Sequence, residues 1–374
     1  MIQQSVLILA TFGLSALCGL LIIPLIESFC RRKGLYDQPD ERKIHKSNIP
    51  RLGGISFVPI MTIAVLAVIM THNQDAPSSN KISISTWSLT FLFSILIVYG
   101  IGIVDDLMGL GAKTKFIGQA VAALLLPLSG LYINHLYGFL GIYDIPFIAG
   151  LPLTVFVIVF ACNAINLIDG IDGLSSCLSF VALAGFLTSF LHDGMYSYCV
   201  LIAGLMGVLA AFVYFNIWGS AEKKTKIFMG DTGSLTLGFI LGFLFVKHVM
   251  INPESNVYHE DALATAFSLV IVPMFDVVRV SMARISHHRP LFKADKNHIH
   301  HKLMRFGLTQ HQTLCAILAL SVLFIFLNQL LLHFIGLTLM VGTDIAIWAL
   351  LNYSLNLGIR KKGLSPFMVM ETLG

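Results

Sequence analysis

The feature of this chain that most constrains its fold is a series of long apolar runs that contain almost no charged residues. An α-helix needs about 20 mostly apolar residues to cross the hydrocarbon core of a bilayer. Eleven runs approach this length, and their approximate positions are 5–28, 52–70, 86–104, 116–133, 147–163, 174–191, 197–216, 233–249, 262–283, 311–334 and 336–357. The sequence therefore predicts an all-α integral membrane protein with about 11 transmembrane helices, built as a single multi-pass domain over residues 1–374.

The expected spans differ in how well the sequence supports them. The fifth is the weakest, because residues 134–152 are rich in Gly, Pro and Tyr. The last two, over 311–357, are separated by very few residues and are expected to form a tight helical hairpin. The longest polar stretches have about 25 residues, so a separate soluble domain does not fit anywhere in the chain.

The overall composition argues against a soluble protein. The 374 residues are 56% hydrophobic and 12% charged, whereas soluble domains carry roughly 25% charged residues. The 6 cysteines show no CxxC pairing, so we predict neither a disulfide framework nor a zinc ribbon. Because residues 1–4 hold no positive charge and no cleavage site follows, we interpret the first run as a membrane span and not as a removable signal.

The distribution of Lys and Arg predicts how the spans are oriented. Cytoplasmic loops of membrane proteins collect these residues. When the loops are assigned to alternate sides, 22 of the 24 Lys and Arg residues fall on one side, and only Lys81 and Lys247 fall elsewhere. This pattern places the N-terminus outside and the C-terminus in the cytoplasm, and an even number of spans would break it.

The motifs with chemically reactive side chains all lie on the predicted cytoplasmic side, which is typical of an enzyme supplied from the cytosol. A multi-pass anion transporter is the alternative class of protein, and it more often places ionisable residues near mid-membrane on broken helices. The span interiors of this chain hold few such residues, and Asp344 is an exception that the sequence does not explain.

The first motif is a pair of adjacent carboxylates, Asp105 and Asp106, at the inner end of the third run. Carboxylates at a membrane boundary are costly to desolvate, and a close pair suits metal binding or proton abstraction. Lys113 and Lys115 follow in the same loop and offer cations to a phosphate. A solvated helix end that carries two adjacent Asp residues is the structural alternative.

The second motif extends from residue 163 to residue 173, between the fifth and sixth runs. Its amides and carboxylates recur every three residues, a spacing that places side chains on one side of a helical turn; they are Asn163, Asn166, Asp169 and Asp172. The interleaved glycines let a ligand approach the backbone closely. A polar turn with Asn and Asp caps is the alternative, but four such residues between two apolar runs favour a binding site.

The third motif, residues 228–234, reads Phe-Met-Gly-Asp-Thr-Gly-Ser, with Asn216 upstream of it. Asp231 offers a hard oxygen ligand of the type that Mg²⁺ prefers. The run also resembles a helix N-terminus, where backbone N–H groups favour anions. Capping of that helix by Thr232 or Ser234 is an equally supported structural alternative.

The fourth motif places three histidines within four positions, at His298, His300 and His301. Imidazole is a common metal ligand, but zinc sites usually add Cys partners or an HExxH motif. Neither occurs here, which also argues against an intramembrane metalloprotease, so we favour a cradle of neutral or charged imidazoles for phosphate and sugar. A loop that obeys the positive-inside rule accounts for only some of the basic neighbours, which are Arg284, His287, His288, Arg289, Lys293 and Lys296.

A weaker fifth motif, residues 45–54, reads His-Lys-Ser-Asn-Ile-Pro-Arg-Leu-Gly-Gly. It places basic side chains and a flexible Gly-Gly pair beside the membrane. Contact with anionic lipid headgroups is as well supported as a role in a site.

In their order and spacing, the motifs resemble those of the polyprenyl-phosphate N-acetylhexosamine-1-phosphate transferases, in the glycosyltransferase 4 or MraY–WecA superfamily. Segment 37–54 also looks like that family, so the resemblance covers residues 37–310. The histidine motif is similar to the WecA/TagO branch and differs from the phospho-MurNAc-pentapeptide translocases. In one departure, a DDxxD pattern would place an acid where this chain has Gly109, which makes a metal role for the first motif less secure than one for Asp231.

The resemblance implies a role for each matching residue. It implies that Asp105 and Asp106 form a catalytic acidic pair near the lipid phosphate, and that Asp231 binds Mg²⁺, for which Mn²⁺ can substitute, with Asn166 as a second ligand. The residues that it places at the nucleotide are Asp169, Asp172, Asn216 and Phe228, with Phe228 stacked on uracil. The residues that it places at the phosphates and the sugar are Lys115, Arg284, His298, His300 and His301.

The implied reaction transfers N-acetylglucosamine 1-phosphate from UDP-GlcNAc to undecaprenyl phosphate and releases UMP at the bacterial inner membrane, as the first membrane step of cell-surface polysaccharide synthesis. Another UDP-N-acetylhexosamine, such as GalNAc or a modified sugar, is the alternative substrate. The downstream glycan, whether lipopolysaccharide O-antigen, enterobacterial common antigen or a cell-wall polymer, stays open. We expect the lipid bilayer as a partner and no nucleic acid, and we leave homodimerisation open.

Overall fold

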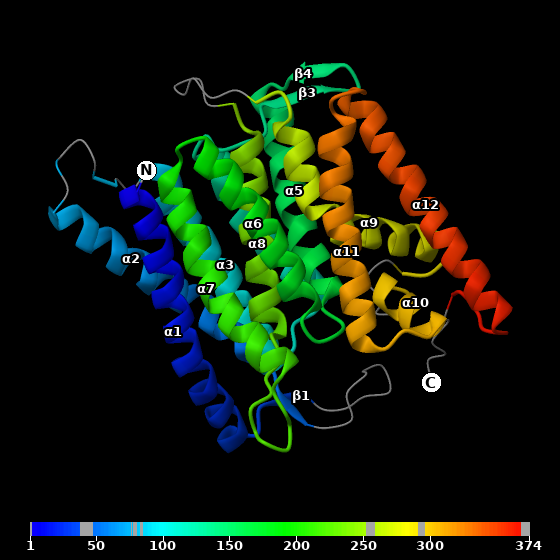
Figure 1. Cartoon of the computed structure of the whole chain (residues 1–374), viewed down its shortest axis with the longest axis horizontal. Helices are drawn as coiled ribbons and strands as arrows, with labels where there is room; N and C mark the ends of the chain where they lie inside the picture. The colour runs from blue at the N-terminus through cyan, green and yellow to red at the C-terminus, as the bar shows by residue number, and fades with distance from the viewer. Residues whose placement is uncertain are drawn as a thin grey trace.

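The computed structural model describes residues 2–37, 48–75, 77, 81–82, 85–251, 259–290 and 296–367. Long helices run side by side through the molecule (Figure 1). The elements in chain order are α1 (Ile2–Lys33), β1 (Tyr36–Asp37), β2 (Ile49–Pro50), the 3-10 helix η1 (Gly53–Ser56), α2 (Phe57–Asp75), α3 (Thr86–Met108), α4 (Ala112–Leu128), β3 (His135–Phe139), β4 (Ile142–Asp144), α5 (Phe147–Ile168), α6 (Leu174–His192), α7 (Tyr196–Ile217), α8 (Gly230–Val249), α9 (Ala262–Ser286), α10 (Ile299–Phe306), α11 (Gln310–Leu331) and α12 (Leu337–Lys361). The prediction of an all-α multi-pass membrane protein is confirmed.

Ten helices in these ranges are long and apolar enough to cross a membrane. The fourth expected span is not among them, because α4 has only 17 residues, the lower limit for a crossing. Helix α4 nevertheless runs the length of α3. The Lys115 ammonium binds Asp105 at one end, and the Trp87 indole N–H donates to the Ser129 carbonyl oxygen, 3.0 Å away, at the other end. Among the described residues, α4 thus adds an eleventh helix to the ten that are long enough to cross a membrane.

A short hairpin accounts for the Gly-, Pro- and Tyr-rich stretch before the fifth span. Strands β3 and β4 pair antiparallel, with His135 opposite Asp144 and Phe139 opposite Ile142. The hairpin lies at the upper end of the bundle in Figure 1, and α5 begins three residues after it, at Phe147. The weakest of the expected spans is therefore a complete helix.

Helix α8 lies at the centre of the bundle, where it packs against α3, α5, α6 and α9 with nearly all of its residues buried. Two glycines allow close contacts of α8 with α5 and α3. A Cβ on Gly238 would lie 2.5 Å from the Cα of Cys162 in α5, and a Cβ on Gly102 in α3 would lie 2.5 Å from the Cα of Thr232. In a bilayer, such close van der Waals contact holds helices together, because lipid tails are as apolar as the side chains. The first turn of α8 is thereby held against the ends of α3 and α5.

A second apolar cluster joins the C-terminal helices to the turn after α5. Helices α9 to α12 contribute Ile271, Ile299, Phe324 and Trp348, and the turn between α5 and α6 contributes Ile171. Because α10 carries the histidine motif, this cluster brings the fourth motif beside the second.

Asp344, which the sequence leaves unexplained, belongs to a buried polar contact between three helices. The Asn328 amide of α11 donates to the Asp344 carboxylate of α12 and to the Ser268 hydroxyl of α9, each at 2.9 Å. All three side chains are fully or almost fully buried. The contact therefore ties the α11–α12 hairpin to α9, a structural task and not a transport site.

We expect Asp344→Ala to lower the stability of the protein by about 1 kcal/mol, because one donor of Asn328 would lose its buried acceptor. Asp344→Asn keeps an acceptor oxygen at this place and adds a donor beside the Asn328 carbonyl oxygen, which has no partner among the described residues. The Asn variant should therefore melt within about 1 °C of wild type. Thermal unfolding of the purified proteins in detergent, followed by size-exclusion chromatography, measures the Tm of both variants. An equal decrease in Tm for the two variants would contradict the structural role of Asp344.

Candidate active site

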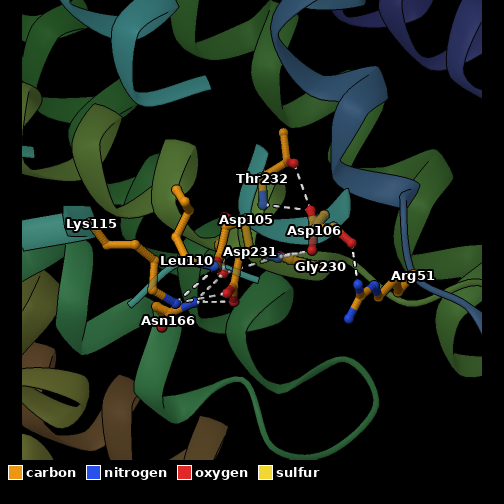
Figure 2. Close-up of polar contacts among 10 residues, drawn as sticks. Arg51, Asp105, Asp106, Leu110, Lys115, Asn166, Gly230, Asp231 and Thr232 are labelled. Carbon is orange, nitrogen blue, oxygen red and sulfur yellow. Dashed lines mark hydrogen bonds and ion pairs between the residues drawn. The ribbon is translucent and has the colours of Figure 1, made fainter. Parts of the chain in front are cut away.

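Four helices contribute one polar side chain each to a cluster at the lower end of the bundle in Figure 1. Helices α3 and α5 end there, and α4 and α8 begin there. The four side chains are Asp105, Lys115, Asn166 and Asp231, and together with Asp106 we call them the carboxylate cluster. Figure 2 shows the side chains of Asp105, Lys115, Asn166 and Asp231 turned toward one another, and that of Asp106 turned toward Thr232. The structure thus brings together the first three sequence motifs.

The Lys115 ammonium lies between two carboxylates of the cluster. Its Nζ is 2.8 Å from Asp105 Oδ2 and 3.0 Å from Asp231 Oδ2 (Figure 2). The Asn166 amide donates to Asp231 Oδ1 at 2.7 Å and to the Ser234 hydroxyl at 2.8 Å. The Asp105 side chain is 5% exposed and that of Asp231 is 35% exposed. Asp231 is therefore the carboxylate of this pair that a soluble ligand can reach.

Asp106 is engaged differently, because its carboxylate caps the first turn of α8. It accepts from the backbone N–H groups of Asp231 and Thr232, each at 2.9 Å, and from the Thr232 hydroxyl at 2.6 Å. No side chain within α8 supplies a cap, so neither Thr232 nor Ser234 has the capping role that the sequence leaves open. A carboxylate suits this place, because a helix N-terminus carries partial positive charge and unpaired N–H groups.

The start of η1 is packed tightly against the same turn. The backbone N–H groups of Gly53 and Gly54 donate to the carbonyl oxygens of Phe228 and Met229, at 2.9 and 2.8 Å. A Cβ on Gly54 would lie 2.2 Å from the Cα of Gly233. The expectation of a flexible Gly-Gly pair is therefore wrong; these glycines are required because two backbones approach closely. Arg51, beside them, donates to the Asp106 carbonyl oxygen.

The second motif divides between a helix and a loop. Asn163 and Asn166 lie in the last turns of α5, where Asn163 donates to Gln119 of α4 at 2.7 Å. Asp169 and Asp172 follow the helix end at Ile168, so the expected single helical face does not extend to them. The Ser175 hydroxyl donates to Asp169 at 2.6 Å, and burial, aided by nearby carboxylates, raises the pKa of Asp169 to about 7. Asp172 pairs with Lys226 at 2.6 Å.

Two residues expected at the nucleotide hold loops together. The side-chain oxygen of Asn216 accepts from the Gly173 N–H at 2.7 Å, and its side-chain amide nitrogen donates to the Ile227 backbone oxygen at 2.9 Å. Asn216 is 5% exposed, so its position indicates a bridge between two loops. The Phe228 ring is half-buried, and its backbone N–H donates to the Pro50 carbonyl oxygen at 2.7 Å.

The histidine motif is anchored by a residue that sequence reasoning missed. Asp276 of α9 is fully buried and accepts from Arg279 at 2.7 Å, from His298 Nδ1 at 2.8 Å and from the Ile299 N–H at 2.9 Å. It thereby caps α10 and orients His298. The signal available in the sequence was an Asp and an Arg three residues apart near the end of an apolar run, a spacing that places them on one face.

The remaining histidines lie beside the second motif. His300 is buried, and neither ring nitrogen has a hydrogen-bond partner among the described residues. A Cβ on Gly170 would lie 2.2 Å from His300 Nε2, so the ring packs directly on that glycine. Burial and neighbouring positive charges hold the pKa of His300 well below its ordinary value and lower the pKa of His301 to about 4. The imidazoles of these two residues are therefore neutral at pH 7.

We call His298, His300, His301, Asp276 and Arg279 the histidine cluster. Arg284, two turns after Asp276 on α9, is also buried. The residues expected from sequence thus form two groups: the carboxylate cluster, and the histidine cluster with the loop that carries Asp169. The parts of the sequence motifs that lie outside the described residues are Gln38, Pro39, His45, Lys46, Ser47 and Lys293.

The donor set of the carboxylate cluster fits a hard divalent cation. Asp105 and Asp231, from different helices, already converge on one positive charge, that of Lys115. Carboxylate oxygens are the ligand type that Mg²⁺ prefers, and the Ser234 hydroxyl lies beside them, bound by the same Asn166 amide nitrogen that donates to Asp231. The acid that a DDxxD pattern would add is absent for a structural reason: Gly109 ends α3 with a φ of +71°, a conformation that favours glycine.

Comparisons with known proteins agree with these features. Residues 88–249 match the family model of glycosyl transferase family 4. A Bacillus subtilis (strain 168) protein named as a probable undecaprenyl-phosphate N-acetylglucosaminyl 1-phosphate transferase is 32% identical, over 86% of this chain and 84% of its own length. A Mycobacterium leprae (strain TN) decaprenyl-phosphate N-acetylglucosaminephosphotransferase is 33% identical, over 72% and 70%. An Escherichia coli (strain K12) undecaprenyl-phosphate alpha-N-acetylglucosaminyl 1-phosphate transferase is 29% identical, over 78% and 76%.

The first two relatives exceed 30% identity across more than two thirds of this chain, and the matched family region contains every member of the carboxylate cluster. The chain therefore belongs to glycosyl transferase family 4, within the polyprenyl-phosphate N-acetylhexosamine-1-phosphate transferases.

Proposed function

We propose that this protein transfers N-acetylglucosamine 1-phosphate from UDP-GlcNAc to undecaprenyl phosphate, giving undecaprenyl-diphospho-GlcNAc and UMP. The observation that carries the proposal is the carboxylate cluster, where Asp105, Lys115, Asn166 and Asp231 meet from four helices at one end of a membrane bundle. The relatives are named as enzymes that transfer N-acetylglucosamine phosphate to undecaprenyl or decaprenyl phosphate, which supports the lipid acceptor and the sugar proposed here.

The reaction forms one phosphorus–oxygen bond and breaks another. An oxygen of the lipid phosphate attacks the phosphorus that bears the sugar. The bond from this phosphorus to the bridging oxygen of the diphosphate breaks, and UMP leaves with that oxygen. Asp105 takes the remaining proton from the lipid phosphate, since the Asp106 carboxylate is committed to three donors in α8. Both substrates are anions, so positioning and charge neutralisation provide most of the catalysis.

Asp231, with Asn166 beside it, would hold Mg²⁺ or Mn²⁺ in this cluster. When bound, the ion supplies a Lewis acid that neutralises the diphosphate and stabilises the leaving group. Lys115 adds a positive charge for a phosphate beside the same carboxylates.

The histidine cluster and the loop before α6 would bind the rest of UDP-GlcNAc. Neutral imidazoles accept and donate hydrogen bonds without a fixed charge, which suits sugar hydroxyls and phosphate oxygens. His300, whose ring nitrogens lack partners in the described structure, packs on Gly170, one residue from Asp169. The half-buried Phe228 ring offers a face to uracil, and the buried Arg284 lies on the helix that carries Asp276.

The carboxylate cluster would face the cytoplasm of a bacterial inner membrane. By the alternation of loops along the sequence, 22 of the 24 Lys and Arg residues are assigned to the side where this cluster lies. Lys247, one of the two exceptions, is buried under the Trp87 ring at 4.4 Å, at the other end of α3. In this orientation the cytosolic nucleotide sugar meets the lipid phosphate at the inner leaflet, at the start of a cell-surface polysaccharide.

The direct test supplies the purified protein with UDP-GlcNAc, undecaprenyl phosphate and Mg²⁺ and measures both UMP and the lipid-linked sugar. We expect both products in equal amounts, background UMP without lipid, and no products with EDTA. Asp231→Asn should lower kcat/KM at least about 100-fold through loss of a metal ligand, whereas the exposed Asp144→Asn, at the other end of the bundle, should match wild type.

Each other outcome has a defined meaning. Product with another UDP-N-acetylhexosamine in place of UDP-GlcNAc would keep the reaction class and change the sugar. Stoichiometric UMP without lipid would contradict direct attack and favour an aspartyl-phosphate intermediate. The absence of both products with every UDP-sugar, in a folded protein, would contradict the proposed function.

The two adjacent carboxylates should separate in their effects. Asp105→Asn keeps an acceptor for the Leu110 N–H and should leave thermal stability close to wild type, while it lowers kcat at least about 100-fold. Asp106→Asn turns an amide toward N–H groups of α8 and should cost about 1–3 kcal/mol of stability. Thr232→Val, which removes only one donor to Asp106, serves as the milder control. An Asp106→Asn protein as stable as wild type would contradict the capping role.

A further inference from the structure

A group of metal-ligand side chains lies at the end of the bundle opposite the carboxylate cluster. Helix α6 starts beside Asp169 and ends at that far end with His192 and Asp193, and His259 approaches them from just before α9. Asp193 Oδ1 is 2.6 Å from His259 Nε2 and 3.5 Å from His192 Nδ1. In the part of the chain that the structure describes, this is the one group of three His, Cys, Asp or Glu residues whose ligand atoms all lie within 4.8 Å of one another.

The position of Asp193 calls for a positive charge. It is the C-cap residue of α6, where the unpaired carbonyl groups carry partial negative charge and a carboxylate is unfavourable. Its side chain is only 5% exposed, so water screens it poorly. Glu260 and Asp261 follow His259 and add further negative charge. Among the described residues, Asp193 pairs only with the imidazoles of His192 and His259, and with no Lys or Arg.

Two imidazoles and one carboxylate form a donor set typical of zinc, in which a water molecule occupies the fourth position. Ligand atoms about 2.0–2.1 Å from a tetrahedral ion lie roughly 3.3 Å apart. The 3.5 Å separation of His192 and Asp193 already matches this value, and the 2.6 Å contact of His259 must open only slightly. His192 is 79% exposed, which gives an ion and its water access from solution.

We propose that His192, Asp193 and His259 form a binding site for a divalent transition-metal ion of the zinc class. The ion would replace the hydrogen bond between His259 and Asp193 with bonds that tie the end of α6 to the start of α9. Helix α9 carries Asp276 in its C-terminal half, so the site braces the helix that anchors the histidine cluster. The proposal does not depend on the transfer reaction.

Calorimetric titration of the full chain in detergent with ZnCl₂, after removal of metals with EDTA, tests the site. We compare wild type with His259→Gln and His192→Gln, and we use His333→Gln as the matched control, because His333 is an exposed histidine at the same end of the bundle. One zinc ion should bind with a low-micromolar or tighter Kd. The His259→Gln and His192→Gln substitutions should each weaken zinc binding at least tenfold, and His333→Gln should leave the zinc affinity unchanged.

Thermal unfolding gives a second readout that does not depend on activity. Zinc at 100 times Kd should raise the Tm of wild type and of His333→Gln by about 2 °C or more. It should not raise the Tm of His259→Gln or of His192→Gln. Because His192 is exposed, its variant should fold normally, and its Tm without metal checks this. Equal zinc binding by wild type and both cluster variants, or equal affinity for Mg²⁺ and Zn²⁺, would overturn the proposal.

Discussion

The capping of α8 by Asp106 is the contact on which the geometry of the carboxylate cluster depends. A carboxylate at the end of one helix holds the first turn of another through two backbone N–H groups and one hydroxyl. Gly230 adopts a φ of +75°, and a Cβ there would lie 2.2 Å from the Arg51 carbonyl oxygen and 2.7 Å from the Asp106 carboxylate. The turn must therefore be glycine, and Asp231, the next residue, is directed toward Lys115 and Asn166 (Figure 2).

The rest of the bundle serves to bring separate motifs to this turn. Helix α8 is buried on all sides, and small residues let α3 and α5 approach it closely, so the ends of three helices meet with little freedom. Catalytic side chains on rigid helix ends can be held in register without a mobile loop. The second apolar cluster does the same for α10, whose neutral histidines lie against Gly170. A polar site thus forms at one end of a molecule that is otherwise apolar.

Much of the fold could be predicted from the sequence, because a bilayer imposes a length and a composition on every crossing. The charge pattern required an odd number of passes, which kept the short α4 in the count. The meeting of Asn166 with Asp231 was expected only through a family resemblance, since no local pattern reports contacts between distant helices. The capping role of Asp106, the anchoring role of Asp276 and the close packing of Gly54 depend on partners 125, 22 and about 180 residues away along the chain, and no spacing rule reports them. Asp344 was visible as an anomaly, but its partners on α9 and α11 were not.

The central claim is that the carboxylate cluster is a metal-dependent centre for phosphoryl transfer. Anomalous X-ray scattering from crystals grown with Mn²⁺ and UDP-GlcNAc tests it most directly, because the signal locates the ion without reference to activity. We expect a manganese peak about 2.1 Å from an Asp231 carboxylate oxygen, with the diphosphate bound beside it and the Lys115 ammonium moved from its place between the two carboxylates. A peak found only at His192, Asp193 and His259, or a nucleotide bound away from Asp231, would contradict the account.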